Sequence, residues 1–310
     1  MWLVIAAAFA ISGQQQDSGQ DRTISREATE VESIEVTGRR LEDAARDFAR
    51  SVDDRPPLGT LPGRWAKPLC ISVAHFRAPW GQYVSDGVGR RAAEVGLDVG
   101  GPGCRTNVLI VGAEDGARMA DSLIRADRRR FRDRVDHSSK DLFDLERFRT
   151  SDAPVRWWHI TYPRSIDEGV LMGGRSLNSP DASAPVMAVR APSLIRPTLR
   201  YDIETVTVVI DLSKTARTSM AALTDYVAMV VLTQIDPYRA PMAHPSVLNV
   251  FEEPDLYPEG MTDWDIDYMH AVYDADLNRN SVAGHRAEVT RALTERRRQR
   301  SSEDVSLGED

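Results

Sequence analysis

From Trp65 onward, short apolar runs alternate with longer stretches in which apolar residues recur at helical spacing. Alternation of this kind predicts a domain that contains both helices and strands. The runs predicted as buried strands are 69–74, 107–112, 155–162 and 203–212. The helices predicted between them are 81–95 and a long stretch over 116–149 that is broken near 136–138.

The most apolar helix of the chain is predicted over Met220–Ile235, after a cap at Thr218 or Ser219. Its apolar residues run almost all the way round, so this helix belongs in the middle of a domain. The pattern predicts an α+β fold, with a mixed sheet of about four to five strands, a buried central helix and C-terminal helices. The C-terminal helices are predicted at 264–273, capped by Asp263, and at 284–298.

Outside this core the chain is polar or interrupted by turn residues. Residues 1–13 are predicted as a signal peptide. Residues 14–63 are predicted as a disordered segment followed by a short strand, a helix over 41–52 and a linker rich in proline and glycine. A single α+β domain is expected over 64–300, and a disordered acidic tail over 301–310.

The N-terminal apolar run, Trp2–Ile11, is too short to cross a bilayer, but it has the length and the small-residue exit of a secretory signal. Cleavage after Ala10 or Gly13 would leave no further membrane-spanning segment. A retained anchor or the stub of a mis-assigned start is the alternative, since no Lys or Arg precedes the run. The expected location is therefore the periplasm or the cell exterior.

The chain has two cysteines, Cys70 and Cys104, and both lie in the part that would be exported, where a disulfide persists. Cys70 lies at the N-terminal end of the first predicted strand, and Cys104 lies three residues before the second. Strands joined through a helix are expected to be parallel, so both cysteines should meet at one edge of the sheet. A disulfide there should stabilise the fold by about 3–4 kcal/mol. Two buried free thiols are the alternative.

The composition and net charge of the chain indicate a folded domain and exclude some classes of binding partner. The chain has 310 residues, of which 42% are hydrophobic and 28% charged, and these values suit a folded domain with a solvated surface. Its net charge of −8 argues against a nucleic-acid partner and against general affinity for anionic membranes.

The sequence carries no motif that identifies a catalytic or ligand site. Neither a Gly-x-x-x-x-Gly-Lys-Ser/Thr phosphate loop nor a Gly-x-Ser-x-Gly elbow is present. The histidines are scattered, and none pairs with another at helical spacing. The segment from Asp274 copies the opening of a calcium loop, but Arg279 stands where the turn requires glycine and His285 where glutamate is needed. No cofactor or metal ion is therefore expected.

The predicted strand over 155–162 carries an unusual aromatic pattern. Strand alternation places Trp157, His159 and Thr161 on one face. Aromatic strands line some sugar and peptide clefts, although tryptophans beside a sheet more commonly belong to the core. Trp157 and His159 are kept as cleft candidates.

The order strand, helix, strand, helix, strand, strand and buried helix resembles the zincin-like metallopeptidase domains, whose central helix carries His-Glu-x-x-His. The chain is also similar to a group of uncharacterised exported bacterial envelope proteins that have this layout without the motif. The similarity spans about residues 65–275. It is carried by Pro68–Val73, Gly103–Val108, Ala222–Met229 and Thr262–Asp265 with Ala271–Tyr273.

Transferred by position, the metal-binding pair and the base of those peptidases fall near Asp225, Tyr226 and Met229. Zinc in such sites needs two imidazoles one helical turn apart and a carboxylate that takes the proton of water. A phenol and a thioether do not replace them. The resemblance therefore implies a pseudoenzyme, inactive as a zinc peptidase, whose cleft binds an extended peptide or glycan.

A separate resemblance concerns Ile34–Arg40, Ile-Glu-Val-Thr-Gly-Arg-Arg, which is similar to a segment near the N-terminus of TonB-dependent outer-membrane receptors. The chain has no room for their large barrel. A local strand is the simpler interpretation, and docking to a periplasmic partner is the alternative.

These observations predict a non-catalytic exported envelope protein that acts as a binding or scaffolding domain. Its partner would be an envelope protein, a peptide or a glycan. One alternative is a peptide or glycan hydrolase that uses His159 with Asp263, Asp265 and Asp267. A TonB-linked accessory protein is the other.

Overall fold

The structure is a computed structural model. It describes residues 40–53, 61–128, 130–131, 142–166, 199–236, 239–241, 243–252, 259–276 and 281–307. The chain divides into two units, 1–41 and 42–310, and the sheet with its covering helices belongs to the second. The predicted signal peptide, the TonB-like segment except for Arg40, and most of the predicted linker lie outside the described residues.

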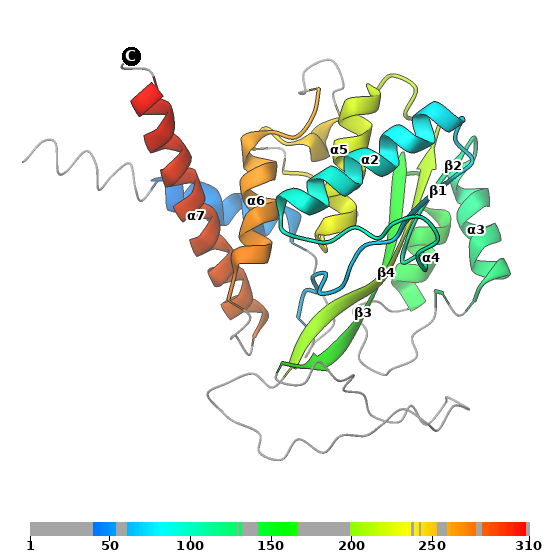
Figure 1. Ribbon diagram of the computed structural model, residues 1–310, viewed down its shortest axis with the longest axis horizontal. Helices are drawn as coiled ribbons and strands as arrows, with labels where there is room; N and C mark the ends of the chain where they lie inside the picture. Colours follow the sequence, from blue (N-terminus) through cyan, green and yellow to red (C-terminus); the bar gives the residue numbers. More distant parts are fainter. Residues whose placement is uncertain are drawn as a thin grey trace, which may run out of the picture. The chain divides into compact units, whose positions relative to one another are not determined.

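Four strands form one mixed sheet in the order β1-β2-β4-β3 (Figure 1). The first three in this order are parallel to one another, and β3 runs antiparallel to β4 at the edge. This arrangement confirms the predicted α+β fold, its mixed sheet and its parallel first pair of strands. The strands are β1 (Ile71–Ala74), β2 (Val108–Ala113), β3 (Val155–Ser165) and β4 (Leu199–Asp211).

Helices cover both faces of the sheet, as Figure 1 shows. Alternation along β3 supplies both faces: Trp157 joins the larger core, whereas Trp158 and Ile160 join a smaller core on the opposite face. The larger core lies under α2 (Ala78–Glu94) and α5 (Met220–Leu232). The smaller core lies under α3 (Gly116–Ala126) and α4 (Leu142–Thr150).

The predicted central helix is α5, and it is buried from Ala222 to its end. The Ser219 side chain caps it by accepting a hydrogen bond from the Ala222 amide. The helix ends at Leu232, three residues before the predicted end, because Thr233 adopts an extended conformation. Two side chains satisfy carbonyls of the last turn: Trp65 Nε1 donates to Val231 O at 2.8 Å and the Tyr273 hydroxyl donates to Leu232 O at 2.6 Å.

A helix over 40–52 packs against this core, close to the predicted range of 41–52. Its apolar face is Ala45, Phe48, Ala49 and Val52, all at most 1% exposed. Phe48 stacks on Trp264 with ring centroids 5.5 Å apart. Burial of this face ties the segment before the linker to the domain that follows it.

Two helices close the C-terminal part: α6 (Asp263–Asp274) and α7 (Val282–Leu307). The predicted cap of α6 is wrong by one residue, because Thr262 and not Asp263 caps it. Thr262 forms a reciprocal capping box with Asp265. The predicted end of the last helix, residue 298, is also too early, since α7 continues to Leu307. No helix within the described portion of the chain has the length and apolar character that a bilayer span requires.

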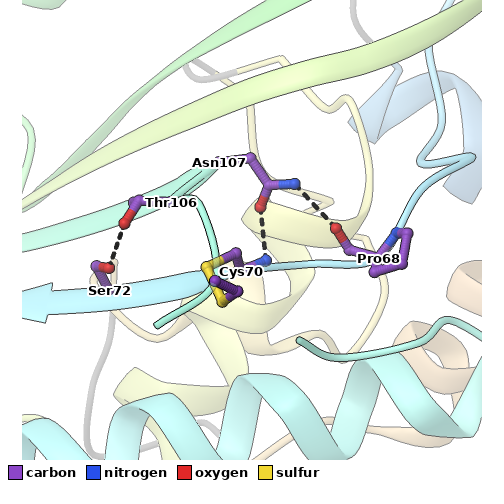
Figure 2. Close-up of a disulfide and its surroundings, with 6 residues drawn as sticks. Pro68, Cys70, Ser72, Thr106 and Asn107 are labelled. Atoms are coloured by element: carbon purple, nitrogen blue, oxygen red, sulfur yellow. Dashed lines mark hydrogen bonds between the residues drawn. A yellow bond between two sulfur atoms is a disulfide. The ribbon is translucent and has the colours of Figure 1, made fainter. Parts of the chain in front are cut away.

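Cys70 and Cys104 form a disulfide with Cα atoms 5.8 Å apart (Figure 2). It lies where β1 and β2 begin, since Ile71 pairs with Val108. Asn107 reinforces the same point: its Oδ1 accepts from the Cys70 amide at 2.7 Å and its Nδ2 donates to Pro68 O at 2.9 Å. The predicted disulfide is thus confirmed, and it joins the chain at the N-terminal ends of β1 and β2.

Candidate functional site

Four of the five predicted cleft residues lie in the interior: Trp157, His159, Tyr226 and Met229. Trp157 and Tyr226 are brought together, with ring centroids 6.2 Å apart in an edge-on arrangement. His159, on the same face of β3 as Trp157, is 1% exposed, and Met229 is fully buried in the larger core. Burial raises the pKa of Tyr226. These positions make the four side chains parts of the packing between β3 and α5.

The fifth predicted residue, Asp225, faces α2 and forms a two-pronged ion pair with Arg91. Arg91 Nε donates to Oδ1 at 2.9 Å, and Nη2 donates to Oδ2 at 2.8 Å. The Met261 amide also donates to Oδ2, at 2.8 Å. Both partners are mostly buried, with 17% of the Arg91 side chain and 11% of the Asp225 side chain exposed. The carboxylate therefore joins α2, α5 and the segment before α6.

The acids of α6 hold their own helix to its neighbours. Asp265 is fully buried and accepts hydrogen bonds from Ser246 Oγ, from the Val247 amide at 2.8 Å and from Thr262. Burial raises its pKa despite these donors. Asp267 accepts from two arginines of α7, at 3.0 Å from Arg297 Nη1 and at 2.7 Å from Arg300 Nη2. Each of these two carboxyl groups is thus engaged in structural contacts.

No group of three or more histidine, cysteine, aspartate or glutamate residues is placed to hold a metal ion within the described ranges. The predicted calcium-like segment is only partly described, because residues 277–280 lie outside those ranges. Asp274, its first residue, forms an ion pair with Arg296 at 2.9 Å. His285, its last, is 91% buried.

A pocket of about 270 Å³ opens beside the C-terminal end of α6. Its walls come from the segment before β1, the turn after α2, the start of β4 and the end of α6. We call it the Arg64 pocket. Its charged lining is Arg64, Arg200, Asp202 and Asp274, and its apolar lining includes Trp65, Leu97 and Tyr201. None of the five cleft residues predicted from the sequence lines it.

Arg64 is held in this pocket by the end of α6. Its backbone pairs with β4 through Arg64 N to Tyr201 O at 3.2 Å and Ile203 N to Arg64 O at 3.0 Å. Its Nη1 donates to the carbonyl oxygens of Val272, Tyr273 and Ala275 at 3.3, 2.8 and 3.1 Å. A guanidinium is favourable at a helix C-terminus, where unpaired carbonyls carry partial negative charge. The contact fixes one nitrogen and leaves Nε and Nη2 without a hydrogen-bond partner among the described residues.

The surroundings of Arg64 carry a local positive excess in an acidic chain. Burial is the main cause that lowers the pKa of Arg64, while the nearby Asp202 and Asp274 act in the opposite direction. Asp202 is paired with Arg200, whose Nε donates at 2.9 Å. The charged lining groups and their ion-pair partners comprise four basic side chains against two acidic ones. The basic ones are Arg64, Arg164, Arg200 and Arg296, and the acidic ones are Asp202 and Asp274.

A second groove, of about 370 Å³, lies between the helix over 40–52 and α7. Several arginines line it, but most are engaged with acids of their own surroundings. Arg286 pairs with Asp53, and Arg291 pairs with Glu288. Arg50 is the exception, because its guanidinium has no partner among the described residues. Arg50 is exposed, whereas Arg64 is held in place by the end of α6, so this groove offers an anion a less ordered cation than the Arg64 pocket does.

Sequence reasoning missed Arg64 because its partners are remote in the chain. The carbonyls that hold it lie more than 200 residues away, at a separation of 208 for Val272. Its only local signal is an arginine that directly follows a glycine and proline linker and precedes a buried tryptophan.

His285 of α7 provides a pH-dependent test of the packing around Arg64. Burial, followed by the charges of Arg64 and Arg286, lowers its pKa to about 4 from the ordinary value of 6.5. The unfolded chain therefore binds a proton between these values that the folded chain does not, and stability falls as the pH is lowered through this window. Between pH 7 and pH 4, we expect wild type to lose about 3 kcal/mol more than His285→Gln.

The measurement is urea unfolding of both proteins across that range, with the difference between the two profiles taken at each pH. Parallel profiles would contradict the buried, neutral state of His285. Loss of stability below pH 4 does not test it, because the carboxylates dominate there.

Comparison with models of protein families, with curated proteins and with solved structures finds no match to this chain.

Proposed function

We propose that this chain is a non-catalytic exported envelope protein that binds a small ligand, or the end of a larger one, in the Arg64 pocket. One observation carries the proposal: the pocket holds a guanidinium whose Nε and Nη2 have no partner among the described residues, whereas Asp225, Asp265 and Asp267 are engaged in structural contacts. Polar groups that converge in a concave, partly apolar pocket are typical of ligand sites. The disulfide is compatible with a location outside the cytosol and supports export.

A degenerate zincin-like core is part of the same proposal. The mixed sheet with an antiparallel edge strand and the buried α5 are consistent with it. At the positions that would carry the metal-binding pair and the base, Asp225 is bound to Arg91, Tyr226 packs on Trp157 and Met229 is in the core. These contacts favour a packing role for the helix.

The test is a ligand screen by thermal shift on the disulfide-intact chain, with Ala66→Trp as the matched variant. Ala66 is exposed and lines the pocket, so a tryptophan there fills the space without removing a hydrogen bond of Arg64. We expect hits that raise the melting temperature of wild type and not of Ala66→Trp. If every hit stabilises both proteins equally, the pocket is not the binding site.

The hydrolase alternative is tested on the same preparations with peptide and peptidoglycan substrates. We expect no turnover that His159→Ala removes. Turnover lost in that variant, or one equivalent of zinc lost with it, would replace the binding proposal by the hydrolase.

A further inference from the structure

The geometry points to a ligand that presents a carboxylate to Arg64, next to a short apolar group. The inference deepens the proposed function and rests on it, since it names the chemical class that the Arg64 pocket would accept.

The inference rests on the two nitrogens of Arg64, Nε and Nη2, that are available to a ligand. Nη1 already donates to three carbonyls at the end of α6, which fixes the plane of the guanidinium. Nε and Nη2 have no hydrogen-bond partner among the described residues. These two nitrogens form a fork that matches the two oxygens of a carboxylate. A group fixed in advance loses little conformational entropy when a ligand binds.

Other arginines of this chain use the same fork for the same purpose. Arg91 directs Nε and Nη2 to the two oxygens of Asp225, at 2.9 and 2.8 Å. Arg200 does so with Asp202, at 2.9 and 3.2 Å. At Arg64 the same fork is present, and no described residue supplies a carboxylate to it.

The charges around the pocket favour a single negative charge on the ligand. The acids nearest to Arg64 are already engaged, since Asp202 pairs with Arg200 and Asp274 pairs with Arg296. A ligand with one negative charge would be attracted by the local excess of positive charge. It would also give the half-buried guanidinium hydrogen-bond acceptors in place of the water that burial removes. Charge-assisted hydrogen bonds of this kind are stronger than neutral ones.

The walls of the pocket define the rest of the ligand. Trp65, Leu97 and Tyr201 supply apolar surface beside the charged groups. The volume of about 270 Å³ lies just below the usual range for small-molecule sites, roughly 300–1,000 Å³, so a compact ligand is expected. A carboxylate with one apolar side chain fits this description, either as a free acyl amino acid or as the C-terminal residue of a peptide.

The experiment is a calorimetric titration of the full exported chain with three probes. They are N-acetyl-leucine, N-acetyl-leucinamide and an acetylated tripeptide that ends in leucine with a free carboxylate. We expect the two acids to bind at least about tenfold more tightly than the amide, because a hydrogen bond to a charged group is worth about 1.5–3 kcal/mol. Tighter binding of the tripeptide would assign the source to peptide ends, and tighter binding of N-acetyl-leucine would assign it to free acids.

Two variants and a control locate the effect. Arg64→Lys keeps the charge and loses the fork, so we expect it to lose most of the preference for the acid over the amide. Ala66→Trp keeps Arg64 and fills the pocket, so it should abolish binding even if Arg64→Lys proves unstable. Arg50→Gln removes an arginine of the other groove whose guanidinium has no partner among the described residues, and it should change nothing.

The contrary outcomes are distinct. Equal affinity for acid and amide, or an equal loss in Arg50→Gln, would overturn the carboxylate assignment and leave the binding function standing if Ala66→Trp still removes other ligands. Binding that survives in Ala66→Trp would overturn both.

Discussion

Asp225→Ala should lower the free energy of unfolding by up to about 3–5 kcal/mol, because it breaks the mostly buried two-pronged ion pair and leaves Arg91 with Glu94 as its remaining carboxylate partner. The same change removes the acceptor of the Met261 amide, which lies just before α6. The expected result is therefore a loss of stability, measured by urea unfolding. A catalytic or ligand-binding role in a water-filled cleft predicts little change in stability.

The chain offers a matched control for this prediction. Arg149 and Glu146 form the same two-pronged contact, with Nε and Nη2 of the arginine at 2.9 and 2.6 Å from the two carboxylate oxygens. This pair is exposed, at 41% and 54%, so Glu146→Ala should leave the unfolding midpoint almost unchanged. If Asp225→Ala is as mild as Glu146→Ala, the interior role assigned to Asp225 is wrong.

Loss of the disulfide is the second large effect. The bond closes a span of 34 residues, and its removal should cost about 3–4 kcal/mol in the chain-entropy model. For a domain of this size that corresponds to a fall of about 10 °C in the melting temperature. The variant is Cys70→Ala with Cys104→Ala, since alanine places no unpaired hydroxyl at the buried Cys70 position.

Reductant supplies the control for the double variant. It should lower the melting temperature of wild type to that of the variant and leave the variant itself unchanged. We expect the reduced protein to stay folded, because Asn107 still bridges the Cys70 amide and Pro68 O. If the variant is as stable as wild type, the disulfide does not contribute to the stability of the domain.

The sequence predicted the sheet well because its strands are short apolar runs bounded by turn residues. The parallel pairing of β1 and β2 followed from the helix between them, and the cysteine pair followed from that pairing. The central helix was recognised because its apolar residues encircle it. These features are local, or follow from one rule of chain topology.

The predictions were less accurate where a helix end or a side-chain pairing depends on residues that are close in space but not in sequence. Thr262 and Asp263 are both good capping residues, and the reciprocal bond to Asp265 selects the first. The last helix, α7, continues beyond its predicted end at residue 298. Near that position its residues Arg297 and Arg300 contact Asp267 of α6. The position of Asp225 on the central helix predicted a cleft residue and gave no sign of its ion pair with Arg91, which lies 134 residues earlier. Pairings at such separations leave no periodic trace in a sequence.

The state of the cysteines in the cell tests most directly whether this is an exported, crosslinked binding domain. Protein recovered from the envelope or the medium should begin after Ala10 or Gly13, and its cysteines should resist alkylation until a reductant is added. Intact precursor in the cytosol, with both Cys70 and Cys104 open to alkylation, would contradict it.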